Sequence, residues 1–599
     1  MPFAATDEFK AALPPVTEEF KFAEDRLERL RRNQSRPKTV CVIGGGIAGL
    51  TAAYELLDPT NTGLVHKVVL VEATERLGGR VWTWHPHKDQ SDLHGEFGAM
   101  RVPPNHHGTM HYIDEVFKLA KGTFVQSNPN AWCQVGDHKE RRRDFGALLS
   151  LHGVKLGRWY YKRGSDPRAA LFDLLEASLG VRLKGRAVLN GKLDPTTRAF
   201  DRVSLWQFLR EIEIKPRDEH DTDPNADAVY ARRRSGRLGH SKGDLTRGDQ
   251  IVGATAWELL SRASGQRWRE TLSALEEWVE SAAILGGDNR IRLVAGMDAL
   301  PNAFVGGIEA RGGQIIQEKP VTRVTRSGGE HPMHVYVKGP GQVEEEITAP
   351  GQDGFDYVVC AAPASATARI SFNPPLPAAQ SAALTGIPYQ NAAKYLLHMK
   401  RRRWENDPRN PIFGGASYTD RLIQQCWYPS DNVRHVYPAA PNSTHEPLVY
   451  NVGAGDQGAA AYTIFEVQGD PSPHAWERPA VLTAAYMTGV NADRFISLTK
   501  SQRKEAVLSC LDELHPGIRD DVCCEADCAW MEQTTPGGGA WTLYEPGGRE
   551  RYWEHLRKPH PVADPRVFFA GEHLSLLHGW IQSAIQSSIE AVMRVLEAY

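Results

Sequence analysis

Hydrophobic positions recur along the chain with two periods, one typical of helices and one typical of strands. Residues 17–32 carry apolar side chains three and four positions apart, which predicts an amphipathic helix ahead of Pro37. The runs at 39–43 and 66–71 are short and apolar, which predicts two buried strands with a helix between them. Strands that alternate with helices in this way are typical of an α/β fold.

The pattern changes in the middle of the chain. From about 145 to 285 the apolar residues follow mostly helical spacing, but the segment 215–250 is polar and highly charged, which predicts a loop or flexible insertion. Strand-like runs return at 313–324 and 357–362. A last strand at 567–569 precedes a glycine turn and a helix.

The turn after the first strand carries the most informative motif. Gly44, Gly46 and Gly49 have the spacing G-x-G-x-x-G, in which glycine permits a tight turn and lets backbone N–H groups approach a pyrophosphate at a helix N-terminus. Glu72 ends the second strand about twenty residues further on, where dinucleotide sites place a carboxylate for the ribose hydroxyls. A carboxylate there would repel a 2′-phosphate. The motif therefore predicts FAD or NAD rather than NADP.

The string RLGGRVWT at 76–83 separates these two cofactors. Its glycines offer further N–H groups and Arg80 offers a bidentate cation beside a bound pyrophosphate. Together with the glycine turn, this string resembles the flavin-dependent amine oxidase family, which implies FAD. The strings FAGE at 569–572 and GWIQSA at 579–584 are similar to those with which amine oxidases hold the ribityl chain, the pyrophosphate and the pyrimidine end of the flavin.

Because both ends of the chain would then hold one cofactor, the resemblance implies a discontinuous FAD domain. The implied fold class is α/β, with an FAD-binding Rossmann-like domain of the glutathione-reductase type, a mixed α+β substrate domain and a helical domain. The predicted divisions are an N-terminal helical extension at 1–37, the FAD-binding domain at 38–105, 288–365 and 546–599, the substrate-binding domain at 106–144 and 366–545, and the helical domain at 145–287 with a polar insertion at 215–250.

More closely, the chain resembles the L-amino acid oxidase branch of this family. GAMRVP at 98–103 is similar to the branch's G-x-M-R-x-P string, in which the arginine, here Arg101, binds the substrate α-carboxylate. Lys394 matches a lysine that holds a water near the reactive flavin nitrogen, and Tyr450 matches a tyrosine that adds a hydrogen bond to the carboxylate. A structural salt bridge at Arg101 and a buried core tyrosine at Tyr450 are the alternatives.

Two departures from monoamine oxidases carry information. Those enzymes attach the flavin to a cysteine where this chain has Ala540, so we expect FAD to be bound non-covalently. Trp541 and Trp580 stand in place of two tyrosines and would flank the amine and Cα of the substrate. Small neighbours, Ala540 and Gly579, leave room beside them. This predicts an apolar side-chain pocket that favours large apolar or aromatic amino acids over acidic ones.

The implied roles combine into one predicted site. The catalytic residues are Lys394, Arg101 and Trp580, and the substrate-binding residues are Arg101, Tyr450, Ala540, Trp541, Gly579 and Trp580. The residues expected to bind FAD are Gly44, Gly46, Ile47, Ala48, Gly49, Glu72, Ala73, Gly79, Arg80, Gly98, Ala99, Met100, Arg101, Val321, Gly571, Glu572, Trp580, Ile581 and Ala584.

The reaction implied by the resemblance is oxidative deamination of an L-α-amino acid by O₂, giving a 2-oxo acid, ammonia and hydrogen peroxide. An amino-acid 2-monooxygenase of the tryptophan type shares nearly all of these motifs and releases an amide instead. A monoamine or polyamine oxidase is a further alternative, which Arg101 disfavours. A catalytically silent flavin-binding scaffold is the last, and the presence of Arg101 and Lys394 argues against it.

Composition limits the partners. With 70 Lys and Arg against 73 Asp and Glu, the net charge is −3, which gives no general attraction to nucleic acid or to an anionic membrane. The local basic runs at 141–143, 232–234 and 400–403 are expected to be solvated faces. No stretch approaches the ~18 apolar residues of a membrane span. The expected partners are therefore an L-amino acid and O₂, and a homodimer is left open.

The N-terminus and the cysteines indicate the location. The first twenty residues lack the pattern of a signal peptide, and eight cysteines in 599 residues are few, which together predict a reduced, cytoplasmic protein. The cluster Cys523, Cys524 and Cys528 lacks a fourth ligand, and the pair His107 and His111 lacks a third. We therefore expect no metal site.

Overall fold

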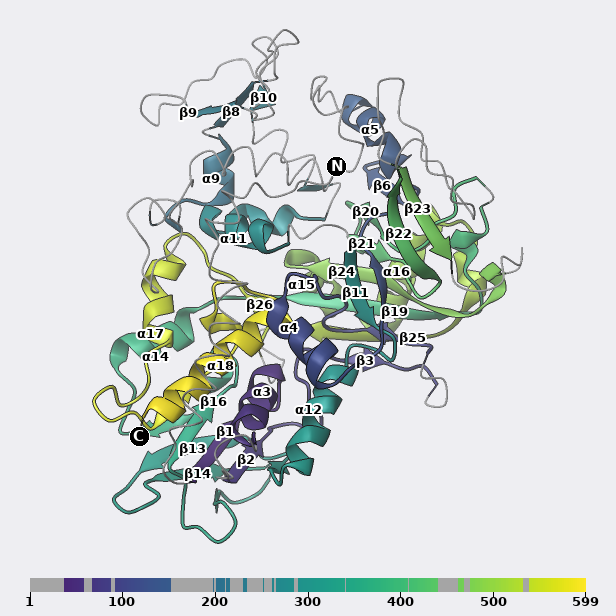
Figure 1. Ribbon diagram of the computed structural model, residues 1–599. Helices are drawn as coiled ribbons and strands as arrows, with labels where there is room; N and C mark the ends of the chain where they lie inside the picture. The colour runs from purple at the N-terminus through teal and green to yellow at the C-terminus, as the bar shows by residue number, and fades with distance from the viewer. Residues whose placement is uncertain are drawn as a thin grey trace.

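The structure is a computed structural model, shown in Figure 1. It describes residues 37–58, 67–87, 92–151, 198, 201–210, 212–215, 230–233, 251–252, 261–262, 265–284, 289–339, 341–407, 409–439, 462–467, 475–531 and 538–598. The helix predicted at 17–32 and Tyr450 lie outside the described residues. Among the described helices, none is long and apolar enough to cross a membrane.

A parallel five-stranded sheet forms the nucleotide-binding part of the fold, with the order β12–β2–β1–β16–β27. Its strands come from the beginning, the middle and the end of the chain, and Figure 1 shows purple β1 and β2 beside teal β16. This shared sheet confirms the predicted discontinuous α/β architecture, whereas the exact domain limits stay a prediction. The strands are β1 (Thr39–Ile43), β2 (Lys67–Val71), β12 (Gln314–Ile316), β16 (Tyr357–Cys360) and β27 (Val567–Phe569).

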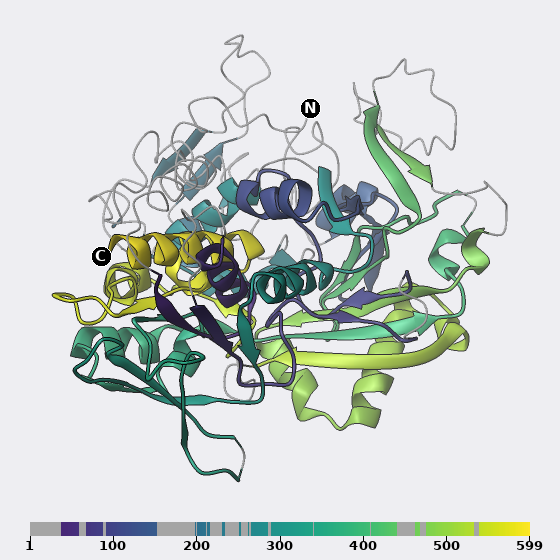
Figure 2. The same ribbon diagram turned by 60° about the horizontal axis from the view of Figure 1, so that its bottom comes forward.

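The alternation of side chains along these strands decides what covers each face of the sheet. Val40 and Val42 of β1 and Leu70 of β2 pack under three helices, which lie side by side over the sheet in Figure 2. Cys41 and Val69 point to the other face, which packs on a four-stranded sheet. The helices are α3 (Ile47–Leu56), α12 (Ala299–Ala310) and α18 (Ile581–Glu597), and the sheet has the order β15 (Glu345–Ile347), β14 (Met333–Val337), β13 (Val321–Arg326) and β17 (Ser371–Asn373).

A mixed seven-stranded sheet forms the second large part, at the right of Figure 1. The side chains of Ala393, Tyr395 and Leu397 pack on α15 (Val490–Ser497) and α16 (Lys500–Leu514). The alternate position, Lys394, therefore faces the opposite side, toward the nucleotide-binding part. The strand order is β25 (Val522–Trp530), β19 (Ala392–Met399), β24 (Ala480–Thr488), β21 (Gln425–Trp427), β20 (Ala416–Thr419), β6 (Trp132–Val135) and β7 (His138–Arg141).

Short strand pairs and helices connect these parts. The pairs are β3 (Thr83–Trp84) with β4 (Gly95–Glu96), β5 (Lys121–Val125) with β11 (Asn289–Leu293), β18 (Tyr389–Gln390) with β26 (Trp541–Thr542), and β22 (Val433–Ala439) with β23 (Tyr462–Val467). The remaining described α-helices of four or more residues are α4 (His107–His111), α5 (Phe145–Leu151), α9 (Leu205–Arg210), α11 (Ala274–Ile284), α13 (Ala364–Thr367) and α14 (Ala378–Gly386).

The predicted helical region, 145–287, also contains strands. β9 (Tyr230–Arg233) falls within the segment 215–250 that we predicted as a loop, and it pairs with β8 (Ile212–Lys215), which in turn pairs with β10 (Ile251–Val252). The loop prediction is therefore wrong for β9. Backbone pairing with a neighbouring strand forms this element, and a charged sequence does not prevent such pairing.

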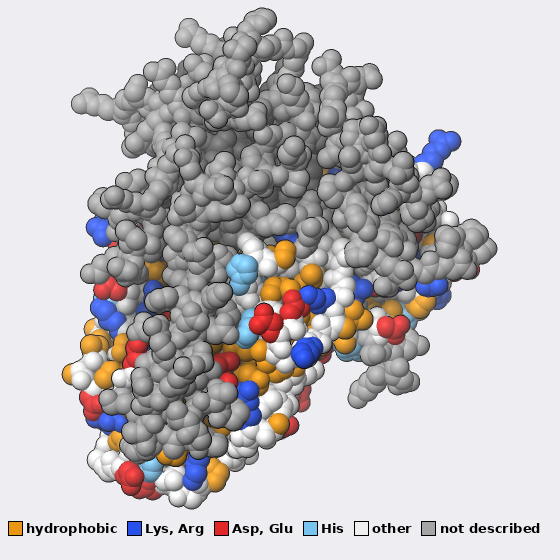
Figure 3. Space-filling model, in the orientation of Figure 1, with side chains coloured by type: hydrophobic (Ala, Val, Ile, Leu, Met, Phe, Trp, Pro, Cys, Tyr) orange, Lys and Arg blue, Asp and Glu red, His pale blue; other side chains and the backbone are white. Residues whose placement is uncertain are grey.

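Two of the basic runs that we expected on solvated faces contain buried arginines. Arg142 donates to the carbonyl of Ala416 at 3.1 Å and to the hydroxyl of Ser127 at 3.0 Å. Arg402 donates to Asp431 Oδ1 at 2.8 Å. Because partners distant in sequence satisfy these guanidinium groups, the arginines are buried. On the described part of the face in Figure 3, residues of both charge signs are interspersed.

Candidate active site

One cavity of about 1060 Å³ lies where the five-stranded sheet, the seven-stranded sheet and the helical region meet. Of the predicted site residues that the structure describes, all except Gly49 line this cavity. Tyr450 lies outside the described residues, so its role stays a prediction. The fold thus brings together residues from motifs that lie hundreds of positions apart in the sequence.

Gly49 has a different place from the one we predicted. A Cβ atom at this position would lie 1.8 Å from the carbonyl oxygen of Gly44, so the first turn of α3 packs directly on the glycine turn. Gly44 has a φ of +106°, which favours glycine. Gly49 therefore supports the cofactor turn from behind and does not line the cavity itself.

The two glycine turns of the motifs pack against each other at the N-terminus of α3. Gly46 forms a β-bridge with Gly78, and a Cβ atom on Gly79 would lie 3.1 Å from the Cα of Gly46. Arg76 fixes the second turn by donating to the carbonyls of Leu77 at 3.0 Å and Val81 at 3.1 Å. Backbone approaches of this kind leave an open, N–H-lined surface that suits a pyrophosphate.

The Glu72 carboxylate is fixed at the end of β2. Its Oε2 accepts a hydrogen bond from the N–H of Gly45 at 2.7 Å, and its Oε1 accepts from the backbone and hydroxyl of Thr74 at 2.9 and 2.8 Å. A carboxylate offers about four acceptor positions, so capacity for a ribose hydroxyl remains. This arrangement fits the role that the sequence predicts.

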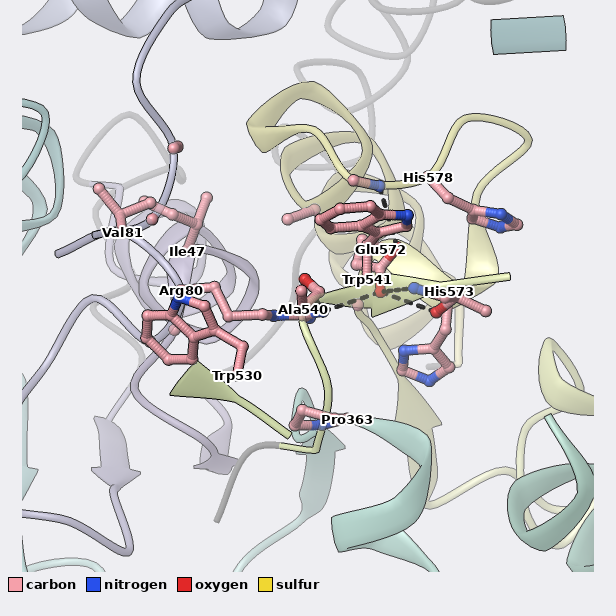
Figure 4. Close-up of a pocket in the computed structure, with 18 of the residues that line it drawn as sticks. Ile47, Arg80, Val81, Pro363, Trp530, Ala540, Trp541, Glu572, His573 and His578 are labelled. Atoms are coloured by element: carbon pink, nitrogen blue, oxygen red, sulfur yellow. Dashed lines mark hydrogen bonds and ion pairs between the residues drawn. The ribbon is translucent and has the colours of Figure 1, made fainter. Parts of the chain in front are cut away.

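Arg80 and Glu572 form an ion pair in the middle of the cavity wall, as Figure 4 shows. Arg80 Nη1 donates to Glu572 Oε1 at 2.9 Å and to the carbonyl of Ala540 at 3.2 Å. Thr542 donates to the same Oε1 through its N–H at 3.0 Å and its hydroxyl at 2.7 Å. Burial alone would raise the pKa of Glu572, but the charge of Arg80 and these hydrogen bonds outweigh it and lower the pKa to about 2. Glu572 is therefore ionised at neutral pH.

Aromatic rings surround Arg101 at the other end of the cavity. The guanidinium carbon lies 5.0 Å from the ring centroid of Trp427 and 5.7 Å from those of Phe124 and Trp580. Such rings attract the cation and exclude water, which strengthens any hydrogen bond that Arg101 makes to an anion. Phe124 and Trp427 were not predicted as site residues, because neither belongs to a motif that the sequence assigns to the site.

Lys394 is buried, and its ammonium group holds the backbone that precedes Arg101. Nζ donates to the carbonyls of Glu96 at 3.0 Å and Gly98 at 2.7 Å. Burial lowers the pKa of Lys394, and the nearby positive charge of Arg101 lowers it further. The Glu96 carboxylate raises the pKa but does not outweigh burial. Burial likewise raises the pKa of Glu96, whose carboxylate accepts from the N–H of Met297 at 2.9 Å. Lys394 therefore loses its proton more readily than an exposed lysine.

Trp541 and Trp580 lie in the cavity wall near Gly579. A Cβ atom on Gly579 would lie 3.3 Å from Trp541 Cγ, so the indole rests on the glycine. The ring of His106 stands edge-on to Trp580, with a centroid distance of 4.9 Å and an interplanar angle of 88°. Burial, together with Arg290, lowers the pKa of His106 to about 3, so this imidazole is neutral. The structure thus places both predicted indoles at the end that contains Arg101.

Comparison with known proteins decides the family. A family model for flavin containing amine oxidoreductases matches residues 47–596. The chain belongs to this family. L-amino-acid oxidases from Gloydius halys and Mus musculus are each 26% identical to it, over 94% of this chain and over 90% and 72% of their own lengths, respectively.

Solved structures share the fold. Cyclohexylamine oxidase from Brevibacterium oxydans IH-35A aligns with a TM-score of 0.56 at 16% identity, covering 94% of this chain and 99% of that one. Putrescine oxidase bound to putrescine aligns with a TM-score of 0.55 at 16% identity, covering 94% of this chain and 98% of the other. These likenesses confirm the fold class.

The cofactor of this amine oxidoreductase is FAD, as the sequence predicts. The glycine turns at α3 and the fixed Glu72 carboxylate fit a dinucleotide, and the cavity that they line also contains Lys394. Among the described residues, no group of three or more His, Cys, Asp and Glu side chains is arranged to hold a metal ion.

Proposed function

We propose that the chain is an FAD-dependent L-amino acid oxidase. It converts an L-α-amino acid, water and O₂ into a 2-oxo acid, ammonia and hydrogen peroxide. The names of the relatives and the Arg101 environment support this proposal. FAD, when bound, supplies the two-electron chemistry by accepting a hydride from Cα of the substrate.

The proposal rests on the guanidinium of Arg101, which is surrounded by aromatic rings at the end of the cavity that contains Lys394. An amine substrate lacks an anionic group for Arg101, whereas an amino acid brings an α-carboxylate that Arg101 can bind bidentately. Phe124, Trp427 and Trp580 surround this contact and keep water from it. Arg101 therefore favours amino acids over amines.

The other residues at this end orient the reacting groups. Trp541 and Trp580 limit where the amine and Cα can lie. Lys394 holds the carbonyls of Glu96 and Gly98, which fixes the 98–101 backbone beside the reacting centre. Positioning of this kind contributes to rate because the substrate is already held in a reactive geometry.

We propose that FAD is bound non-covalently. Ala540 offers no thiol. The described residues that line the cavity include one cysteine, Cys528. Burial raises the pKa of Cys528 to about 12, so its thiol stays protonated and is a poor nucleophile.

A peroxide-release screen tests the function. The purified holoenzyme is incubated with each of the twenty L-amino acids, their D-enantiomers and a set of amines, and the products are identified. We expect peroxide, ammonia and a 2-oxo acid from L-amino acids. A carboxamide product would instead show the amino-acid 2-monooxygenase, and peroxide from amines alone would show an amine oxidase.

A further inference from the structure

A third indole lines the cavity, and it comes from the helical region. Trp268 lies in the short 3₁₀ helix η3 (Arg267–Thr271) and is partly exposed to the cavity. Its ring lies 5.5 Å from that of Trp541, with an interplanar angle of 64°. Edge-to-face pairs of this kind are favourable and fix the orientation of both rings. Trp268 and Trp541 therefore form one continuous wall.

Arg269 packs against the ring of Trp268 and also lines the cavity. Its guanidinium carbon lies 4.5 Å from the Trp268 ring centroid, and the residue is 3% exposed. Nε donates to Gln266 Oε1 at 2.5 Å, Nη1 donates to Glu277 at 2.5 Å, and both Nη atoms donate to Glu280 at 2.7 and 2.8 Å. A network with this many charge-assisted bonds gives the indole a rigid support.

The charges of this network disfavour a substrate with an anionic side chain. The Arg269 guanidinium is shared between the carboxylates of Glu277 and Glu280. The three side chains together therefore carry a net negative charge. Burial alone would lower the pKa of Arg269, but these two carboxylates outweigh it and raise the pKa above its ordinary value. Arg269 is therefore charged but already paired.

A third carboxylate, that of Glu276, also has charged partners. Glu276 lines the cavity, accepts from Arg549 Nε at 2.6 Å and lies 3.3 Å from His578 Nδ1. Burying a substrate carboxylate beside these groups without a cation would be strongly unfavourable.

We infer that Trp268 is a specificity-determining residue: with Trp541 it forms the side-chain wall of the cavity and favours large apolar or aromatic amino acids, while the acidic network that lines the cavity beside it disfavours anionic side chains. This inference rests on the proposed L-amino acid oxidase function. It identifies a contact from the helical region that the motifs alone did not supply. Glutamate should be a poor substrate, because Arg269, the cation of the described part of this wall, is already paired with Glu277 and Glu280.

The test compares substrates within each variant. Values of kcat/KM for L-phenylalanine, L-alanine, L-lysine and L-glutamate are measured for the wild-type holoenzyme, Trp268→Ala and Trp268→Phe. We expect Trp268→Ala to lower kcat/KM for phenylalanine at least tenfold while changing that for alanine less than threefold, because a methyl side chain does not reach the wall. Removing the indole opens space beside the acidic network that lines the cavity, so the lysine-to-phenylalanine ratio should rise. Trp268→Phe should retain most of the phenylalanine activity.

A second variant tests the charge argument. Glu280→Gln removes one of the two carboxylates that share Arg269, and we expect the glutamate-to-phenylalanine ratio to rise at least fivefold. Equal losses for alanine and phenylalanine in Trp268→Ala, or an unchanged glutamate ratio in Glu280→Gln, would overturn the inference and leave the proposed function intact. A wild-type enzyme whose flavin no amino acid reduces would overturn the proposed function and, with it, this inference.

Discussion

Arg101 and Lys394 are both basic residues of the cavity wall, but their surroundings give them different roles. Arg101 lies among aromatic rings, which attract its charge and exclude water from the part of the cavity that it lines. The ammonium of Lys394 is used by the carbonyls of Glu96 and Gly98. We therefore assign recognition of the α-carboxylate to Arg101 and support of the adjacent backbone to Lys394.

Replacement of Arg101 should weaken amino acid binding selectively. We expect Arg101→Met to raise KM for L-amino acids at least tenfold, since a hydrogen bond to a charged group contributes about 1.5–3 kcal/mol. Steady-state kinetics with the matching amines, which lack the carboxylate, supplies the control and should change little. An unchanged KM for amino acids would falsify the carboxylate-anchor assignment.

Because Ala540 has no thiol, FAD should not be attached covalently at this position. We expect acid or heat denaturation to release free FAD into the supernatant, because the Cys528 thiol in the cavity stays protonated. Absorbance spectra of the supernatant and of the redissolved protein measure the distribution. Flavin that remains with the precipitated polypeptide would show a covalent link.

At the scale of elements, the contact between α3 and the first glycine turn controls the cofactor site. Gly49 brings the helix close to the carbonyl of Gly44, which directs the helix N-terminus at the cavity. Ser588 adds a link from α18 by donating to the carbonyl of Ala48 at 2.7 Å. The cofactor turn is therefore held between two helices from opposite ends of the chain.

Substitution of Gly49 should disrupt this contact. We expect Gly49→Ala to lower FAD occupancy and the unfolding temperature, because the new Cβ would lie 1.8 Å from a backbone oxygen that cannot move freely. Gly306→Ala on α12 is the matched control, since a Cβ there meets nothing within 4 Å. That helical Gly-to-Ala change should be neutral or stabilise by roughly 0.5–1 kcal/mol. Equal effects of both substitutions would contradict the close-contact argument.

Local motifs made most of the cofactor site predictable, because each of its turns is specified by a few adjacent residues. The sequence therefore predicted the residues around Gly44, Glu72, Arg80 and Glu572 and the discontinuous sheet. Contacts between distant segments were not predictable in the same way. Trp268 reaches the cavity, and Phe124 reaches Arg101, only through the packing of the helical region and of β5, which no local pattern specifies.

The same reason explains the wrong predictions. Arg402 is buried because Asp431, a partner on a distant loop, neutralises it. β9 forms because β8 supplies its backbone partners. In each case the deciding contact joins segments whose proximity the sequence does not reveal, whereas composition alone favoured exposure or a loop.

At the scale of the whole molecule, buried neutral histidines link folding to pH. Burial lowers the pKa of His106 to about 3, of His515 to about 3 and of His573 to about 4. An unfolded histidine has a pKa of about 6.5. Between these values the unfolded chain binds protons that the folded chain does not, so acidification favours unfolding.

We therefore expect the unfolding temperature to fall as pH decreases below about 6.5, with each such histidine contributing about 1.4 kcal/mol per pH unit. Above that pH the contribution is fully present. Thermal unfolding of the holoenzyme at pH 7.5 and pH 5 measures the slope. His515→Gln, which can retain a hydrogen bond to Tyr428, should reduce this slope. A slope that is identical in the variant would contradict the assignment to His515.

We propose that this flavoprotein oxidises L-amino acids through recognition of their α-carboxylate. Anaerobic titration of the bound flavin with L-phenylalanine and with 2-phenylethylamine tests it most directly, because the two compounds differ only by the α-carboxylate. We expect L-phenylalanine to bleach the visible flavin absorbance, and the amine to do so at least tenfold more slowly. Bleaching by the amine at an equal or higher rate, or no bleaching by any L-amino acid, would contradict the account.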